Sequence, residues 1–194
     1  MSILNTKSEV QQRSQHQIFA TRYNTARHNI LSVVIFTLIN IILCVTNSGR
    51  YFLFSAFVPY MLTDMGMFEC GLYPTEYYNE NFPGMQFADT SFMVVCCVIA
   101  AVILVLYFLS WLLLKKPRVG WMIFALVFFI MDTAVMLLMV IDISDYIIDI
   151  LFHGWVIISL IMGIISYFKL KKMQPEQEET VLENCDMPEQ GIAE

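Results

Sequence analysis

Charged residues are scarce in this sequence. Asp, Glu, Lys and Arg make up only 14% of its 194 residues, whereas 58% are hydrophobic. A soluble domain carries about 25% charged residues, because its surface faces water. The shortage excludes an ordinary soluble domain and predicts a chain that lies largely in lipid.

The sequence also lacks the short motifs of the common enzyme classes. It contains no G-x-S-x-G, H-E-x-x-H, P-loop or dinucleotide-binding pattern. No surface pattern interleaves basic and aromatic residues as nucleic-acid-binding proteins do. We therefore expect no cofactor and no nucleic-acid partner. The sequence favours a non-enzymatic protein without excluding an enzyme.

Cysteines are few and scattered. The five cysteines form no C-x-x-C pair, so a zinc site of the usual spacing is not expected. Two interpretations of Cys44 and Cys70 stay open, because the sequence does not give the geometry that a disulfide needs. The two residues are either bridged or free thiols.

Long apolar runs are what the sequence does contain. Crossing the hydrocarbon core takes about 20 apolar residues. Four runs reach the observed range of lengths: residues 29–46, 92–114, 119–141 and 147–168. The sequence therefore predicts an all-α fold, an integral membrane four-helix bundle.

Basic residues predict the orientation of these spans. All eleven Lys and Arg residues except Arg50 flank the spans on one side, before residue 29, between 114 and 119, or after 168. Positive residues accumulate on the cytoplasmic side of membrane proteins. Four spans with this bias place both termini in the cytoplasm, with the lipid bilayer of the plasma membrane as the main partner.

The connection between the first two spans differs from a simple loop. Residues 51–62 are apolar but too short to span, and they include Pro59. We expect an interfacial helix or a shallow re-entrant segment there. The rest of the connection is rich in Tyr and Phe, which disordered linkers lack. An ordered, aromatic-rich extracytoplasmic cap is therefore expected.

These predictions divide the chain into nine consecutive segments. They are a cytoplasmic N-terminal segment (1–28), the first span (29–46), the extracytoplasmic cap (47–91) with its interfacial segment (51–62), the second span (92–114), a cytoplasmic loop (115–118), the third span (119–141), an external turn (142–146), the fourth span (147–168) and a disordered acidic cytoplasmic tail (169–194).

Two ionisable residues inside the last two spans are candidates for an ion or proton site. A charged side chain near the bilayer centre costs about 2.5–3.5 kcal/mol on insertion scales, so Asp132 needs a partner, a wet cavity or a proton. Asp132 lies eleven residues before Ile143 and His153 ten residues after it, so a hairpin brings them to similar depth. The alternative is that Asp132 only hydrogen-bonds a neighbouring helix.

Asp149 joins this candidate site because Asp145, Asp149 and His153 recur every four residues along one helical face. Such a row of ligands is a weak candidate for a divalent cation site. Three ligands stacked along one helix do not converge on an ion by themselves. A metal site is therefore not expected. Asp142 or Ser144 would cap the fourth helix, and Asp145 in its first turn would complement the helix dipole.

Two stretches of the first connection carry a resemblance. Residues 47–60 (NSGRYFLFSAFVPY) and 70–78 (CGLYPTEYY) resemble uncharacterised small four-span membrane proteins of Gram-positive bacteria. The resemblance covers residues 23–172 and implies a bacterial plasma membrane. It transfers no functional residue.

Two functions are consistent with these features. The first is a non-enzymatic interaction or accessory membrane subunit that contacts a protein partner or a second copy of the chain. The second is a small transporter or proton-linked sensor that uses an intramembrane pair of Asp132 and His153.

Overall fold

The computed structural model is all-helical, and the residues that it describes contain no strand. It describes residues 2–51, 54–116, 118–139 and 146–185, with side chains within 13–173. The elements are α1 (Ser2–Val45), α2 (Phe57–Glu69), α3 (Thr75–Asn81), α4 (Thr90–Leu113), α5 (Val119–Met139) and α6 (Ile147–Cys185). The predicted all-α class is confirmed.

Four of these helices are long and apolar enough to cross a membrane. The segments that meet this condition are Arg13–Val45, Thr90–Leu113, Val119–Met139 and Ile147–Met173. They contain the four runs expected from the sequence, apart from a few residues at the ends. The number of candidate spans is therefore as predicted.

Two helices continue past the expected ends of their spans. Residues 1–28 were expected as a separate segment, but α1 runs unbroken from Ser2 to Val45. The α6 helix extends to Cys185 through part of the tail that we expected to be disordered. Its Gln and Glu residues are good helix formers, which accounts for the extension. The turn at 140–145 and the last residues, 186–194, lie outside the described residues.

Each long helix buries one narrow stripe and exposes the rest. The buried stripe of α5 recurs every three or four residues and consists of Met122, Ala125, Phe129, Asp132 and Met136. The outer face of α4 instead exposes large apolar side chains, among them Val94, Val98, Val102 and Val105. Apolar surface on this scale is incompatible with water and suits lipid.

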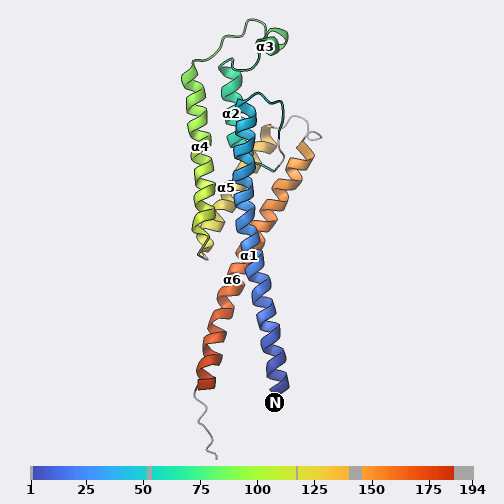
Figure 1. Ribbon diagram of the computed structural model, residues 1–194, viewed down its shortest axis with the longest axis vertical. Coiled ribbons are helices and arrows are strands. Elements are labelled where there is room, and N and C mark those ends of the chain that lie inside the picture. Colours follow the sequence, from blue (N-terminus) through green and yellow to red (C-terminus); the bar gives the residue numbers. More distant parts are fainter. Residues whose placement is uncertain (1, 52–53, 117, 140–145, 186–194) are drawn as a thin grey trace, which may run out of the picture.

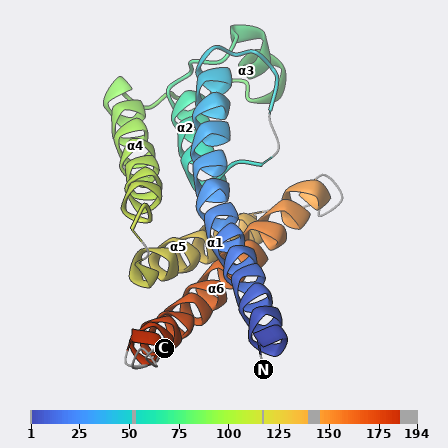
Figure 2. The ribbon, with the colours of Figure 1, turned by 60° about the horizontal axis from the view of Figure 1, so that its bottom comes forward.

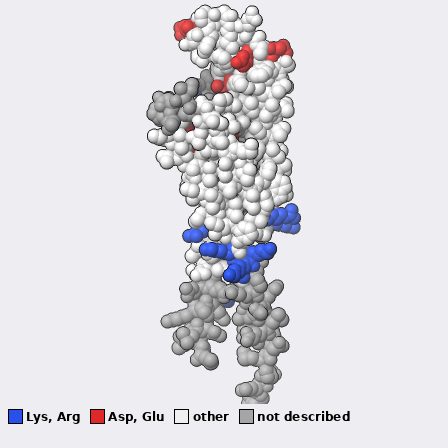
Figure 3. Space-filling view, turned by 180° about the vertical axis from the view of Figure 1, so that it is seen from behind, with Lys and Arg blue, Asp and Glu red and all other residues white. Residues whose placement is uncertain are grey.

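Aromatic and basic side chains meet at one end of the bundle. The Arg27 guanidinium lies over the Trp111 ring at 5.0 Å, and the Lys115 ammonium approaches the same ring at 5.9 Å. The Tyr23 hydroxyl donates to the Leu114 carbonyl. Figure 3 shows Lys and Arg gathered at this end and Asp and Glu at the other. Basic groups far apart in the sequence thus share one end of the bundle, as predicted.

The α2 helix runs back along the long helices. After α1 ends, the chain returns toward the middle of the bundle, and α2 then packs against α4, α1 and α5 (Figure 1). The α5 and α6 helices run obliquely to α1 and α4 (Figure 2). The first turn of α2 therefore lies beside the central part of α5, deeper than a helix at the surface of the bundle.

A glycine permits a close contact between α1 and α6, which cross in Figure 1. A Cβ atom on Gly163 would lie 2.6 Å from the Cβ of Ala26 and 2.7 Å from the Sδ of Met122. Ala26 cannot move aside without shifting α1. The small residues at this crossing set how closely the two helices approach.

We predict that Gly163→Ala lowers the stability of the folded protein by about 1–3 kcal/mol, because the added methyl group forces α1 and α6 apart. Gly154→Ala is the matched control, since nothing lies within 4 Å of a Cβ at that position. Thermal unfolding in detergent should show a lower midpoint for the first variant only. Equal shifts for the two variants would contradict the close contact.

Candidate functional site: a polar junction at the start of α2

The first turn of α2 has no capping residue of its own. The N-cap position is Ala56, whose side chain makes no capping hydrogen bond. The four N–H groups at a helix start have no partner within the helix. Here they belong to residues 56–59, and the last of these is a proline, which has no N–H. Three backbone donors therefore need acceptors from elsewhere.

Side chains of two other helices supply all three acceptors. The Asp132 carboxylate accepts from the Phe57 N–H through Oδ2 and from the Val58 N–H through Oδ1, both at 2.9 Å. The Thr37 Oγ1 on α1 accepts from the Ala56 N–H at 2.8 Å. A carboxylate at a helix N-terminus also interacts favourably with the helix dipole. Asp132 thus caps α2 from the neighbouring helix α5.

His153 on α6 completes the junction. Its Nε2 lies 3.3 Å from the Asp132 Oδ2, and its Nδ1 lies 2.8 Å from the Asp149 backbone oxygen. The imidazole ring stacks on Phe129 at a centroid distance of 4.9 Å. Only 1% of the His153 surface and 5% of the Asp132 surface are exposed. Asp132 and His153, which the sequence places at similar depth, are therefore in contact.

The partners of His153 determine where its protons lie. A backbone carbonyl only accepts hydrogen bonds, so Nδ1 carries a proton toward Asp149. Nε2 then either donates a second proton to the Asp132 carboxylate or accepts one from a protonated Asp132. Both arrangements hold one proton between the two side chains. In the first arrangement the two side chains carry opposite charges, and in the second both are neutral, so their total charge is the same.

Asp149 lies beside the junction and is not fully satisfied. Its side chain is 3% exposed. The backbone of Phe54 provides one hydrogen bond to its carboxylate. The Oδ1 atom is buried and accepts no hydrogen bond from the part of the chain that the structure describes. Buried polar atoms without partners are rare, so this oxygen stands out among the polar atoms around the junction.

The loop that leads into α2 is held in a strained conformation. Phe54 has a φ of 80°, a left-handed value that is unfavourable for a bulky residue. Its ring packs on Phe36 and Phe152 at centroid distances of 6.1 and 4.8 Å. The next residue, Ser55, accepts from Asn40 Nδ2 at 2.8 Å. These contacts hold the loop so that its amide groups face Asp132 and Thr37.

The remaining sequence predictions have mixed outcomes. Asp145 lies outside the described residues, so the row of Asp145, Asp149 and His153 is incomplete. Among the residues that are described, no three His, Cys, Asp or Glu side chains are grouped to hold a metal ion. Cys44 and Cys70 are free thiols, which decides between the two interpretations left open above.

Sequence reasoning missed Thr37, Ser55 and the backbone amides of α2. One signal was available, since Ala56 and Phe57 offer no capping oxygen before Pro59. A helix that starts without a local cap needs an acceptor from another segment. The helix that provides this acceptor is decided by tertiary packing.

No family model, no curated protein and no solved structure matches this chain. The resemblance to small four-span proteins of Gram-positive bacteria therefore stays a prediction.

We predict that Asp132→Asn exposes the amides of residues 57 and 58 to hydrogen exchange. An asparagine oxygen accepts from one of them, but its NH₂ group then faces the other donor. Hydrogen bonds to a charged group contribute about 1.5–3 kcal/mol, so exchange should accelerate about 10- to 100-fold. Exchange mass spectrometry on peptides from residues 54–62 measures the change.

Thr133→Val is the control for this experiment, because the one partner of the Thr133 hydroxyl among the described residues is the Phe129 carbonyl of its own helix. Its exchange pattern should match that of the unmodified protein. Unchanged protection in Asp132→Asn would show that the carboxylate does not hold α2.

Proposed function

We propose that this chain is a non-enzymatic interaction or accessory subunit of a bacterial plasma membrane, with both termini in the cytoplasm. The separation of charge between its two ends supports this orientation (Figure 3), because basic residues favour the cytoplasmic side. In this orientation α2 begins inside the bilayer as a re-entrant helix, and α3 lies in the extracytoplasmic cap.

Exposed apolar side chains around α3 carry the proposal. Leu72, Tyr77, Phe82 and Phe87 are each 42–50% exposed, although none of them belongs to a candidate span. The rings of Phe68 and Phe82 pack edge to face at 5.1 Å, so the surface is built on an ordered base. Apolar surface that faces water marks a contact with another protein.

The hydrogen bonds that the buried polar groups accept support the same function. Both oxygens of Asp132 accept backbone hydrogen bonds, and Thr37 accepts a third. A carboxylate engaged in this way is poorly placed to act as a general base on a substrate. The junction is therefore suited to holding α2 in place, which fixes the shape of the cap.

Site-specific photo-crosslinking tests this proposal. A photoreactive phenylalanine at position 82 should give one discrete protein adduct in native membranes, with either a different protein or a second copy of the chain. The matched control is the same probe at Val98, on the outer face of α4, which should react only with lipid. A chain that stays monomeric and gives no protein adduct at position 82 would contradict the function.

A second candidate function is proton-linked sensing or transport through Asp132 and His153. It is favoured by the contact between these two side chains and by the buried Oδ1 of Asp149, which has no hydrogen-bond partner among the described residues. Protonation of the carboxylate weakens it as an acceptor for α2, so the junction links a proton to the position of this helix.

Proton flux in proteoliposomes tests the second candidate. Under an imposed pH gradient the unmodified protein should carry protons, and Asp132→Asn should abolish the flux. His153→Gln should also abolish it while keeping the α2 amides protected from exchange. Asp89→Asn is the control, because it removes an exposed carboxylate and asparagine caps α4 equally well. If Asp132→Asn equals the unmodified protein at every pH, the pair is structural.

A further inference from the structure

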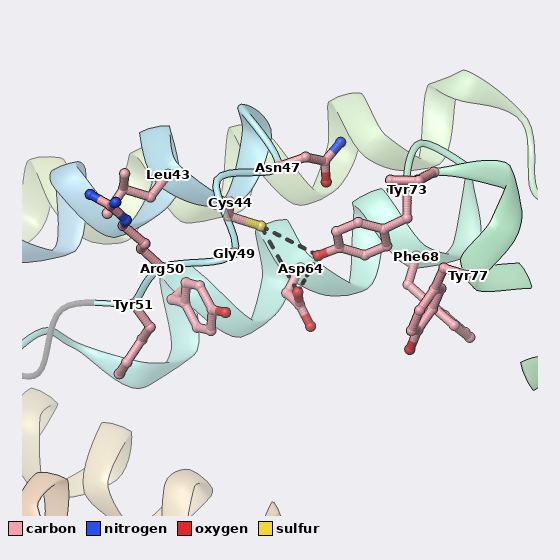
Figure 4. Close-up of a pocket in the computed structure, with 12 residues that line it drawn as sticks. Leu43, Cys44, Asn47, Gly49, Arg50, Tyr51, Asp64, Phe68, Tyr73 and Tyr77 are labelled. Carbon is pink, nitrogen blue, oxygen red and sulfur yellow. Dashed lines mark hydrogen bonds between the residues drawn. The ribbon is translucent and has the colours of Figure 1, made fainter.

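A partly open pocket lies along α2 beyond its first turn. Its volume is about 520 Å³, within the range of small-molecule sites. It is formed by the end of α1, the loop that follows it, α2, and the chain leading into α3 (Figure 4). The pocket is built from segments on both sides of α2, so its shape depends on the placement of this helix.

Aromatic rings dominate the lining. They are Tyr51, Tyr60, Phe68, Tyr73 and Tyr77. Tyr51 and Tyr60 lie 4.8 Å apart and Tyr73 and Tyr77 lie 5.8 Å apart, measured between ring centroids. The face of an aromatic ring attracts cations, most strongly where water is excluded. Several rings around one space therefore favour a positively charged group.

Three of the tyrosine hydroxyls in the lining, those of Tyr51, Tyr60 and Tyr73, keep their protons at neutral pH. Burial raises the pKa of Tyr51 to about 12, and it also raises the pKa of Tyr60. Burial, followed by the hydrogen bond to Asp64, raises the pKa of Tyr73. These side chains are therefore neutral, and Asp64 is the one acidic residue among those that line the pocket.

One oxygen of the Asp64 carboxylate is available to accept a further hydrogen bond. Its Oδ1 accepts a hydrogen bond from the Tyr73 hydroxyl and lies 3.9 Å from the Cys44 thiol. Its Oδ2 accepts no hydrogen bond from the described residues. Tyr73 fixes the orientation of the carboxylate and leaves this second oxygen available to a ligand.

Arg50 does not neutralise this carboxylate. Arg50 also lines the pocket, but Figure 4 shows its guanidinium turned toward Leu43 and away from Asp64. Apart from Arg50, the charged residues of the surrounding connection are all acids, and those outside the pocket are Glu69, Glu76, Glu80 and Asp89. Figure 3 shows acidic side chains at this end of the molecule. The local field therefore favours cations over anions.

We propose that this pocket binds an organic cation, a quaternary or substituted ammonium group held among the tyrosine rings and paired with Asp64. A small metal ion fits poorly, because Ca²⁺ and Mg²⁺ need several oxygen ligands and the lining offers one carboxylate. A weakly hydrated ammonium group needs few direct ligands and gains from contact with the rings. The site is additional to the protein contact around Phe82.

Two sources provide this chemistry: a free organic cation, or the headgroup of a choline or ethanolamine lipid. The protein should first be placed in phosphatidylglycerol nanodiscs, where no lipid carries an ammonium group. Radiolabelled choline should then bind saturably. It should be displaced by excess choline but not by 3,3-dimethyl-1-butanol, its neutral isostere.

Asp64→Asn keeps the shape of the side chain and removes its charge, so choline should bind at least about tenfold more weakly. Glu76→Gln is the matched control, because it removes one charge from the same connection at a residue outside the pocket. Its affinity should equal that of the unmodified protein. Tyr77→Leu provides a second test if Asp64→Asn folds poorly, since the half-exposed Tyr77 ring can be removed without touching Asp64. This variant should also bind more weakly.

Nanodiscs of phosphatidylcholine separate the two sources. If the natural ligand is a lipid headgroup, this lipid should raise the unfolding temperature of the unmodified protein, but not of Asp64→Asn, and should reduce the binding of free choline. If the ligand is a free cation, neither quantity should change. The proposal is overturned if choline does not bind saturably, if the neutral isostere competes equally, or if Asp64→Asn and Tyr77→Leu both bind as tightly as the unmodified protein.

Discussion

The start of α2 lies among apolar helices, where a backbone N–H group without an acceptor costs several kcal/mol. Water could satisfy these groups at a surface, but at this depth the protein itself must do so. Asp132 and Thr37 provide the acceptors, and Pro59 removes the remaining donor. The path of the chain through α2 therefore depends on a carboxylate that belongs to a different helix. The Nε2 atom of His153, in turn, lies 3.3 Å from the Oδ2 atom of that carboxylate.

This arrangement offsets two costs of burial, one for the Asp132 carboxylate and one for the backbone at the start of α2. An ionised carboxylate is expensive in an apolar environment unless it is paired and hydrogen-bonded. Two amide donors at a helix N-terminus and one imidazole meet this condition. Asp132 and the start of α2 thus each reduce the cost of burying the other. Neither would be stable at this position without its partner.

The same helix connects the polar junction and the aromatic pocket. The first turn of α2 contacts the polar junction, and residues farther along it, Tyr60, Asp64 and Phe68, line the aromatic pocket. Tyr51 belongs to both regions, because it lines the pocket and its hydroxyl lies 3.3 Å from the Ser55 Oγ. A change in charge at Asp132 and a ligand beside Asp64 would therefore act on one rigid element. This geometry gives a physical basis for coupling between the proposed functions.

The sequence by itself determined the helical class, the four apolar spans, the shared end of the basic residues and the similar depth of Asp132 and His153. These properties follow from length, hydropathy and counting along a helix, all of which are local. Only the tertiary structure decided the rotation of each helix, which turned Asp132 toward both His153 and α2. It also brought Asp64 beside Tyr73 and left Cys44 and Cys70 unbridged. Rotation and loop path depend on packing between distant segments, because apolar side chains around most of a membrane helix leave several faces equally able to be buried.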